Sequence, residues 1–209
     1  MKRVYFVRHG ETEGNIGKFF QTAETKLTDA GHRGAEAVAA RFTDVLVDEL
    51  WASHYVRAQQ TAGYIAKVLK INVQIDDAAH EVVRPSSIHG LEHQSPEGKE
   101  HRSSYPENFV KNDWNLDGAE NYFTFIKRMK LFVDRLENTT ANNIVVVSHG
   151  DFIRHLITFF LLSKDVDVTA HMKVYTNLER MSNVGISECV YRDGGWRLLH
   201  WNDHAHFAE

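Results

Sequence analysis

The chain has 209 residues, of which 43% are hydrophobic and 25% charged, and its formal net charge is −4. This length and composition are ordinary for one globular domain that buries a full hydrophobic core. The net charge gives no sign of a nucleic-acid-binding protein, which would carry a strong basic excess. Its one cysteine, Cys189, excludes an intrachain disulfide, and the alternating residues around it predict a small apolar position in a strand.

No stretch of the sequence predicts a membrane anchor. The apolar residues 4–7 are too few for a signal peptide, and residues 152–162 are interrupted by Arg154 and His155. A helix that crosses a bilayer takes about 20 apolar residues. We therefore expect a soluble, cytoplasmic protein with no membrane partner.

The first part of the chain alternates between strand and helix patterns. Residues 4–7 form an apolar run typical of a strand that is buried on both faces. Thr28 is placed to cap a helix over residues 29–42, and apolar spacing predicts a second helix over residues 57–70. Residues 49–52 and 73–75 are the strands expected between and after these helices.

The sequence changes character at residue 79. Residues 79–115 hold all three prolines and little periodicity, so we expect a long excursion from the compact fold, of the kind that is often functional. Asp117 and Glu120 then match a capping box for a helix that extends to about residue 137. A strand over residues 143–147 and a helix to about residue 162 follow, and residues 184–191 and 196–201 predict a β-hairpin.

This alternation predicts an α/β protein with one domain over residues 1–209. We expect three α/β/α layers around a mostly parallel, doubly wound sheet flanked by helices. In such sheets, ligands bind beyond the carboxyl ends of the strands. Two apolar strands end in a His-Gly pair, so we expect His9 and His149 at the same rim of the sheet.

His9 alone would be interpreted as a structural histidine. Its neighbours favour an anion site, because Arg8 is cationic and Gly10 admits a ligand close to the backbone. Transfer of a phosphoryl group to nitrogen needs a neutral imidazole, cations for the equatorial oxygens and an acid for the leaving oxygen. The sequence offers a candidate for each of these parts.

Several motifs resemble those of the histidine phosphatase superfamily, also called the phosphoglycerate mutase-like family. They are Arg8-His9-Gly10-Glu11-Thr12 with Asn15, Leu27-Thr28-Asp29-Ala30-Gly31, the block from Ser53 to Ala62, Glu81, an imperfect Gly118-Ala119-Glu120, and Val147-Ser148-His149-Gly150. They follow the order of the family and cover roughly residues 3 to 155. The ordered set is far more specific than a lone Arg-His-Gly.

The resemblance implies a phosphatase that hydrolyses a phosphomonoester through a phosphohistidine intermediate on His9, without a metal or another cofactor. His149 would stabilise the transferring phosphoryl group and Glu81 would donate the proton. The residues that the resemblance implies in binding phosphate or substrate are Arg8, Gly10, Thr12, Asn15 and Arg57.

Other interpretations remain open for some of these positions. Arg57 could be a solvated first-turn residue, although a cation is disfavoured at a helix N-terminus. His149 could be a buried histidine at a strand end. Arg84 could contact substrate or could lie in solvent on a loop.

The acid is the least determined part of the set. The carboxylates that could serve instead of Glu81 are Asp77, Glu92 and Glu97. The capping box accounts for Glu120 without a catalytic role. The excursion also holds the histidines His80, His89, His93 and His101. Only His89 and His93 have the spacing of a pair on one helix face, and Gly90 and Pro96 make that stretch poorly helical, so we expect no metal site.

The reaction and the substrate are inferred from the excursion, which we expect to form a lid. Mutases of the family resemble one another in a Glu-Arg-His-Tyr-Gly stretch, and residues 81–85 depart from it, which favours a phosphatase over a phosphoglycerate-type phosphomutase. Residues 80–115 hold four Lys/Arg against six Asp/Glu, a balance that disfavours a polyphosphorylated substrate. We expect a small phosphorylated metabolite as the substrate, with a phosphoprotein as the alternative.

The alternative from another functional class is a catalytically inactive module that binds a phosphorylated ligand. The sequence does not show the oligomeric state.

Overall fold

The computed structural model describes residues 1–162 and 167–206. Within these residues the strands form one sheet in the order β3-β2-β4-β1-β5-β6. The strands are β1 (Lys2–Arg8), β2 (Glu49–Ala52), β3 (Val73–Ile75), β4 (Asn143–Ser148), β5 (Ile186–Arg192) and β6 (Gly195–Asp203). The first four strands pair in parallel, and β5 and β6 join antiparallel at one edge. The predicted α/β fold with a mostly parallel sheet is confirmed.

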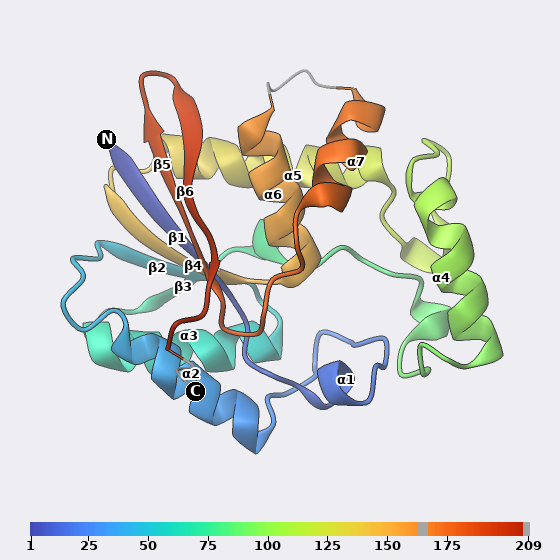
Figure 1. Ribbon diagram of the computed structural model, residues 1–209, viewed down its shortest axis with the longest axis horizontal. Coiled ribbons are helices and arrows are strands. Elements are labelled where there is room, and N and C mark those ends of the chain that lie inside the picture. The colour runs from blue at the N-terminus through green and yellow to red at the C-terminus, as the bar shows by residue number, and fades with distance from the viewer. Residues whose placement is uncertain (163–166, 207–209) are drawn as a thin grey trace.

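The helices cover both faces of this sheet, as Figure 1 shows. The described helices are α1 (Glu13–Ile16), α2 (Asp29–Ala40), α3 (Val56–Leu69), α4 (Pro96–Phe109), α5 (Tyr122–Asn138), α6 (Gly150–Leu161) and α7 (Val168–Asn177). Of these, α2 and α3 cover one face of the sheet, and α5 and α6 cover the other. Thr28 caps α2 as expected, because its side chain accepts a hydrogen bond from the Gly31 amide. No helix among the described residues combines the length and the apolar character needed to cross a bilayer.

The central strand β4 explains why the protein is layered. Ile144 and Val146 pack into the core formed with α5 and α6, whereas Val145 and Val147 pack into the core formed with α2 and α3. All four side chains are fully buried. Successive residues of a strand point to opposite faces, so an unbroken apolar run requires a covering layer on each side. Each such burial stabilises the fold by roughly 1.5–3 kcal/mol.

The C-terminal strands form the predicted hairpin. Asp193 and Gly194 connect β5 to β6, and both have positive φ angles, of 52° and 75°. Two such residues fit a type I′ turn, whose twist matches that of the paired strands. Cys189 is buried in β5, which confirms its prediction as a strand residue.

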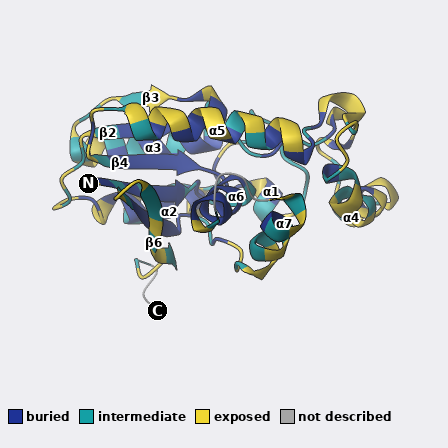
Figure 2. Ribbon diagram, turned by 90° about the horizontal axis from the view of Figure 1, so that it is seen from above, coloured by how far each residue is buried: buried dark blue, intermediate teal, exposed yellow. Residues whose placement is uncertain are grey.

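The excursion differs from the prediction because it contains the helix α4. Ser95 caps this helix by accepting a hydrogen bond from the Gly98 amide, and Pro96 occupies its first turn, where no amide hydrogen is needed. Pro106 lies inside this helix. Because proline is disfavoured in a helix interior, the sequence pattern did not predict a helix here. Figure 2 shows α4 at one end of the molecule, with much of its surface intermediate or exposed.

The predicted cap of the next helix is wrong. Asn121, rather than Asp117, caps α5, and Thr124 completes a reciprocal capping box with it. Asp117 lies in a preceding turn with a φ of 46°. Asn121 is also a short polar residue, and it directly precedes the helix and occupies the N-cap position. Glu120 therefore lies outside the helix and can bind another partner.

The segment between β1 and α2, residues 9–28, is called the first loop. A comparison of two helical glycines tests how α2 packs against it. A Cβ on Gly31 would lie 2.1 Å from the backbone oxygen of Glu11, whereas a Cβ on Gly63 in α3 would meet no atom within 4 Å. We expect Gly31→Ala to lower the free energy of unfolding by about 1–3 kcal/mol, because the backbone after His9 must move. Gly63→Ala should raise it by about 0.5–1 kcal/mol through helix propensity. Urea unfolding measures both, and a Gly31→Ala protein as stable as the wild type would contradict this packing.

Candidate active site

The two histidines that follow apolar strands lie together. Arg8 at the end of β1 pairs in register with Ser148 at the end of β4, so the next residue of each strand reaches the same rim. His9 and His149 are both buried, and the centroids of their rings are 5.2 Å apart. This confirms the expected meeting of the two His-Gly pairs.

The hydrogen bonds of His9 define its tautomer. The Nδ1 atom is 2.7 Å from the carbonyl oxygen of Gly10, and a carbonyl can only accept, so Nδ1 carries the proton. The Nε2 atom accepts a hydrogen bond from Nε of Arg57 at 3.2 Å. Burial, followed by the charges of Arg57 and Arg8, lowers the pKa of His9 well below 6.5. His9 is therefore a neutral imidazole with a lone pair on Nε2.

Arg57 lies in the first turn of α3 and is held near this lone pair by the loop between β1 and α2. Its Nη1 donates to the carbonyl oxygen of Thr22 at 2.8 Å, and its guanidinium lies 4.9 Å from the centroid of the Tyr55 ring. Burial lowers the pKa of Arg57 to about 10, so the group stays cationic at neutral pH. The structure places Arg57 in the site and not in solvent, where a first-turn cation would otherwise lie.

Arg8 supplies a second cation, which is half-buried. Its Nη1 donates to the carbonyl oxygen of Met181, and its Nε is buried without a hydrogen-bond partner among the described residues. Burial lowers its pKa, and the negative charge of Glu81 opposes that effect. A guanidinium whose buried Nε–H group has no partner is well suited to bind an anion.

His149 is the second imidazole of the site; it follows β4 and occupies the N-cap position of α6, although its side chain makes no capping hydrogen bond. Its Nε2 lies 2.9 Å from the hydroxyl oxygen of Ser53, and its Nδ1 is buried without a partner among the described residues. Burial first, and then the charge of Arg57, lowers its pKa well below 6.5. His149 is therefore also neutral.

Glu81 lies against the N-terminus of α6. Its carboxylate accepts hydrogen bonds from the backbone amides of Asp151 at 3.1 Å, Phe152 at 2.8 Å and Val82 at 2.9 Å. Burial and the neighbouring charge of Asp151 raise its pKa above the ordinary 4.5, against the lowering effect of these amides. A raised pKa keeps more of the protonated acid available near neutral pH.

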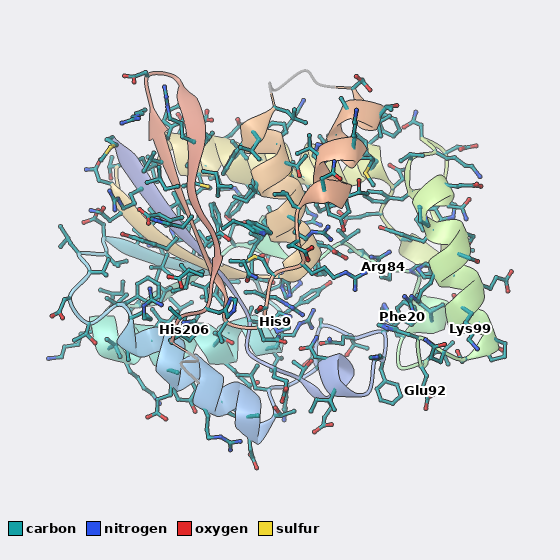
Figure 3. The ribbon with its side chains drawn as sticks, viewed as in Figure 1. His9, Phe20, Arg84, Glu92, Lys99 and His206 are labelled. Carbon is teal, nitrogen blue, oxygen red and sulfur yellow. The ribbon has the colours of Figure 1, made fainter. Side chains whose placement is uncertain are left out.

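The carboxylates considered in place of Glu81 lie elsewhere. Asp77 is 87% exposed and pairs with His54 at 3.3 Å. Glu92 and Glu97 are exposed around the start of α4, and Figure 3 shows Glu92 far from His9, at the outer edge of the molecule. Of these carboxylates, Glu81 is the one held against the start of α6, where His149 occupies the N-cap position.

Glu120 has a structural partner that the sequence pattern did not suggest. It binds Arg128 through two hydrogen bonds, of 2.7 Å to Nε and 2.6 Å to Nη2, and accepts from the Val83 amide at 3.0 Å. Arg128 in turn donates to the carbonyl oxygens of Ala78 and His80, at 2.7 Å and 3.0 Å. The pair therefore fixes the backbone on both sides of Glu81.

Arg84 lies between the sheet and the excursion. It donates to Asp151 at 3.1 Å, and its guanidinium lies 3.6 Å from the centroid of the Tyr105 ring of α4. Figure 3 shows Arg84 and Phe20 between His9 and α4. The Arg84 side chain is 26% exposed. It is therefore not the solvent-exposed loop residue of one interpretation, and it is accessible enough for the substrate contact of the other.

The remaining predicted residues form the loop after β1. The Gly10 amide donates to Thr61 at 3.0 Å. Thr12 is buried and caps α1, a short helix that the sequence did not predict, through a reciprocal box with Asn15. Asn183 donates to the Asn15 side chain at 3.1 Å. Thr12 thus serves the loop structure, and Asn15 is held beside the site.

The excursion's histidines do not assemble. Among residues 1–162 and 167–206, no group of three or more His, Cys, Asp or Glu side chains is placed to hold a metal ion. His93 and His101 instead pack edge-on against Phe20, with centroid distances of 4.4 Å and 5.4 Å. Their role in the described structure is to join α4 to the first loop.

Three residues of the site were not predicted from the sequence. Ser53 was part of a quoted motif but had no role assigned, and only its contact with His149 gives it one. Asp151 directly follows the second His-Gly pair, a signal that could have drawn attention to it. No sequence pattern could have indicated Arg128, because its partners Glu120 and Ala78 are 8 and 50 residues away along the chain.

The comparison with protein families agrees with this geometry. The family model of the histidine phosphatase superfamily (branch 1) matches residues 4–204. The chain belongs to that superfamily.

Relatives extend the likeness over almost the whole chain. A Hydrogenobacter thermophilus protein with the provisional name phosphoserine phosphatase 2 is 26% identical over 205 residues, covering 93% of this chain and 91% of that protein. A Yersinia pestis protein provisionally named as a phosphoglycerate mutase is 27% identical over 207 residues, covering 96% and 90%. The crystal structure of Entamoeba histolytica phosphoserine phosphatase with 3-phosphoglyceric acid has a TM-score of 0.73 at 25% identity and covers 99% of both chains. The names of these relatives are those of phosphatases and mutases, which act on phosphate esters.

The electrostatics of the site predict a pH dependence. His9 and His149 have lowered pKa values in the folded protein, whereas both would titrate near 6.5 in the unfolded chain. Below that pH the unfolded state binds more protons, so we expect stability to fall as the pH drops from about 6.5. Imidazole NMR signals should show both rings still neutral at pH 5.5, and the urea-unfolded protein is the control. A ring that titrates at its ordinary pKa in the folded protein would contradict the arrangement.

Proposed function

We propose that the protein is a phosphatase that hydrolyses a phosphomonoester through a phosphohistidine on His9. The proposal rests on one observation: the Nε2 lone pair of a buried, neutral His9 lies 3.2 Å from the Arg57 guanidinium. A phosphoryl oxygen is a stronger acceptor than an imidazole nitrogen. A bound phosphate would therefore take over the Arg57 donor and leave the Nε2 lone pair facing phosphorus.

The first step transfers the phosphoryl group to the protein. Nε2 of His9 attacks phosphorus, the bond from phosphorus to the ester oxygen breaks, and Glu81 gives its proton to that oxygen. Arg8, Arg57 and His149 would bind the equatorial oxygens and stabilise the charge that gathers there. The proton of His9 stays on Nδ1, which donates it in a hydrogen bond to the Gly10 carbonyl oxygen, so the attacking Nε2 keeps its lone pair.

The second step releases inorganic phosphate. The Glu81 carboxylate takes a proton from water, the water oxygen attacks phosphorus, and the electron pair of the phosphorus–nitrogen bond returns to Nε2. Glu81 is again protonated and His9 is again neutral. The raised pKa of Glu81 supports this double role, because an acid–base group works best when its pKa approaches the working pH.

The proposed reaction needs no metal ion. The guanidinium groups of the buried Arg57 and the half-buried Arg8 would supply the positive charge that a metal provides in other phosphatases. We also propose that Gly10 and Asn15 help to bind the phosphate from the first loop, and that Thr12 acts indirectly by capping that loop.

The second candidate function is a phosphoglycerate-type phosphomutase, which the Yersinia pestis relative favours by name. The stretch after Glu81 supports hydrolysis instead. Val82 is buried in the hydrophobic core and Val83 is part of the backbone contact with Glu120, so neither offers the polar side chains of the mutase pattern. An inactive phosphate-binding module is less well supported, because binding alone has no need for a bare nucleophile.

The substrate we propose is a small phosphorylated metabolite, with residues 79–115 as a lid. Arg84 and the Tyr105 ring would contact the part of the substrate beyond the phosphate. The relative crystallised with 3-phosphoglyceric acid supports a ligand of this size. A phosphoprotein is the alternative. The single buried cysteine also suits a reducing compartment such as the cytoplasm.

A direct assay tests the function. The wild-type protein should hydrolyse 4-nitrophenyl phosphate in the presence of a chelator, and His9→Ala should lose this activity by a factor of about 10⁴ or more. His204→Ala, at an exposed histidine, is the control and should leave the rate unchanged. An inactive wild type would refute the enzyme, activity lost with the chelator would refute the metal-free mechanism, and full activity of His9→Ala would refute the nucleophile. Interconversion of phosphoglycerates would establish the mutase.

The role of Glu81 predicts a dependence on the leaving group. Glu81→Gln should slow hydrolysis of an alkyl phosphate by about 10²- to 10⁴-fold, because the alkoxide must be protonated as it leaves. The effect on phosphorylation by 4-nitrophenyl phosphate should be much smaller, since nitrophenolate leaves without a proton. Burst kinetics separate this step from the release of phosphate. An equal loss with both esters in the phosphorylation step would contradict Glu81 as the proton donor.

A further inference from the structure

The second imidazole of the site is held by a serine hydroxyl that no step above uses. Ser53 follows β2, is fully buried, and is fixed by a backbone hydrogen bond to the Val147 carbonyl at 3.0 Å. Its hydroxyl oxygen lies 2.9 Å from Nε2 of His149. The Tyr55 ring packs on His149 at a centroid distance of 5.0 Å, so the imidazole is restrained from both sides.

The hydrogen bonds around Ser53 determine where its proton goes. A serine hydroxyl has one proton to donate and two lone pairs. The Tyr55 amide, at 3.2 Å, uses one lone pair. Among the hydrogen bonds of the described residues, His149 Nε2 is the one acceptor for the Ser53 proton. A buried hydroxyl that kept its proton unpaired would lose about 1–3 kcal/mol, so donation to Nε2 is the favoured arrangement.

We infer that Ser53 donates its proton to Nε2 of His149 and thereby holds His149 in the tautomer that carries its proton on Nδ1. The Nδ1 atom is buried and has no partner among the described residues. The resulting Nδ1–H group is free to donate to an oxygen of the transferring phosphoryl group. Ser53 is a positioning residue, and this inference rests on the proposed function.

The two histidines then present opposite chemistry to one phosphoryl group. His9 has its proton on Nδ1, directed to the Gly10 carbonyl, and offers the lone pair of Nε2. His149 has its lone pair on Nε2, directed to Ser53, and offers the proton of Nδ1. The other tautomer of His149 would turn a lone pair toward an anionic oxygen, which is repulsive. A neutral donor also avoids the cost of a third positive charge beside Arg8 and Arg57.

The test is the tautomer of His149 in the wild-type protein, measured by two-bond ¹H–¹⁵N correlation spectra of the imidazoles at neutral pH. The signals are assigned by their loss in His149→Asn. We expect a protonated Nδ1 and an unprotonated Nε2. A predominant Nε2–H form would overturn the inference.

Variants connect the tautomer to turnover. Ser53→Ala should shift His149 toward the Nε2–H form and lower kcat by roughly 100-fold, with a smaller change in KM, because a transition-state donor is lost. Ser53→Thr keeps a hydroxyl and should restore the Nδ1–H signal and most of the rate. Ser187→Ala, at a buried serine of β5, is the control and should leave the His149 spectrum unchanged. An unchanged tautomer and rate in a folded Ser53→Ala protein would overturn the inference, and the wild-type spectrum decides if that variant does not fold.

The outcomes separate this inference from the proposed function. An active phosphatase with an Nε2–H tautomer of His149 would refute the role of Ser53 and leave the enzyme intact. A wild-type protein with the Nδ1–H tautomer but without hydrolysis of any phosphate ester would support the hydrogen bond and refute the phosphatase.

Discussion

The hydrogen bond from Nδ1 of His9 to the carbonyl oxygen of Gly10 is the constraint on which the site depends. It fixes the tautomer, and burial beside Arg57 and Arg8 keeps the ring neutral. The Gly10 backbone is held in place from α3, through Thr61, and a Cβ on Gly10 would lie 2.6 Å from the backbone oxygen of Gly31 in α2. Two helices on one face of the sheet therefore determine which nitrogen of His9 can react.

The other face supplies the acid and the second imidazole. Glu81 accepts hydrogen bonds from the amides at the start of α6, and His149 occupies the N-cap position of the same helix. A carboxylate at a helix N-terminus is favoured in its charged form, yet burial and Asp151 oppose this and raise the pKa of Glu81. The balance between these effects on the pKa suits the role proposed for Glu81, which is to give up a proton and regain it. The rim of the sheet thus brings the proposed nucleophile, at the end of β1, to the proposed acid beside α6.

The layered fold and the pairing of His9 with His149 could be predicted from the sequence, because both follow from local patterns: apolar runs in β1 and β4 that end in the same dipeptide. The rest depends on tertiary pairing. The sequence shows that Glu120 is acidic, but only the fold brings Arg128 opposite it, and a nearby Asn121 displaced Asp117 as the cap of α5. The helix α4 was hidden by its prolines and its weak apolar stripe, because it packs on the first loop at one end of the molecule rather than on the sheet.

The central claim is that the phosphoryl group passes through Nε2 of His9. The direct measurement is rapid quenching in alkali during steady-state hydrolysis of a phosphate monoester, followed by mass spectrometry of the digested chain under conditions that preserve phosphohistidine. We expect a phosphoryl group on His9 that forms faster than phosphate is released and that disappears when the substrate is consumed. Steady hydrolysis in which His9 never carries phosphate, or in which another residue carries it, would contradict the account.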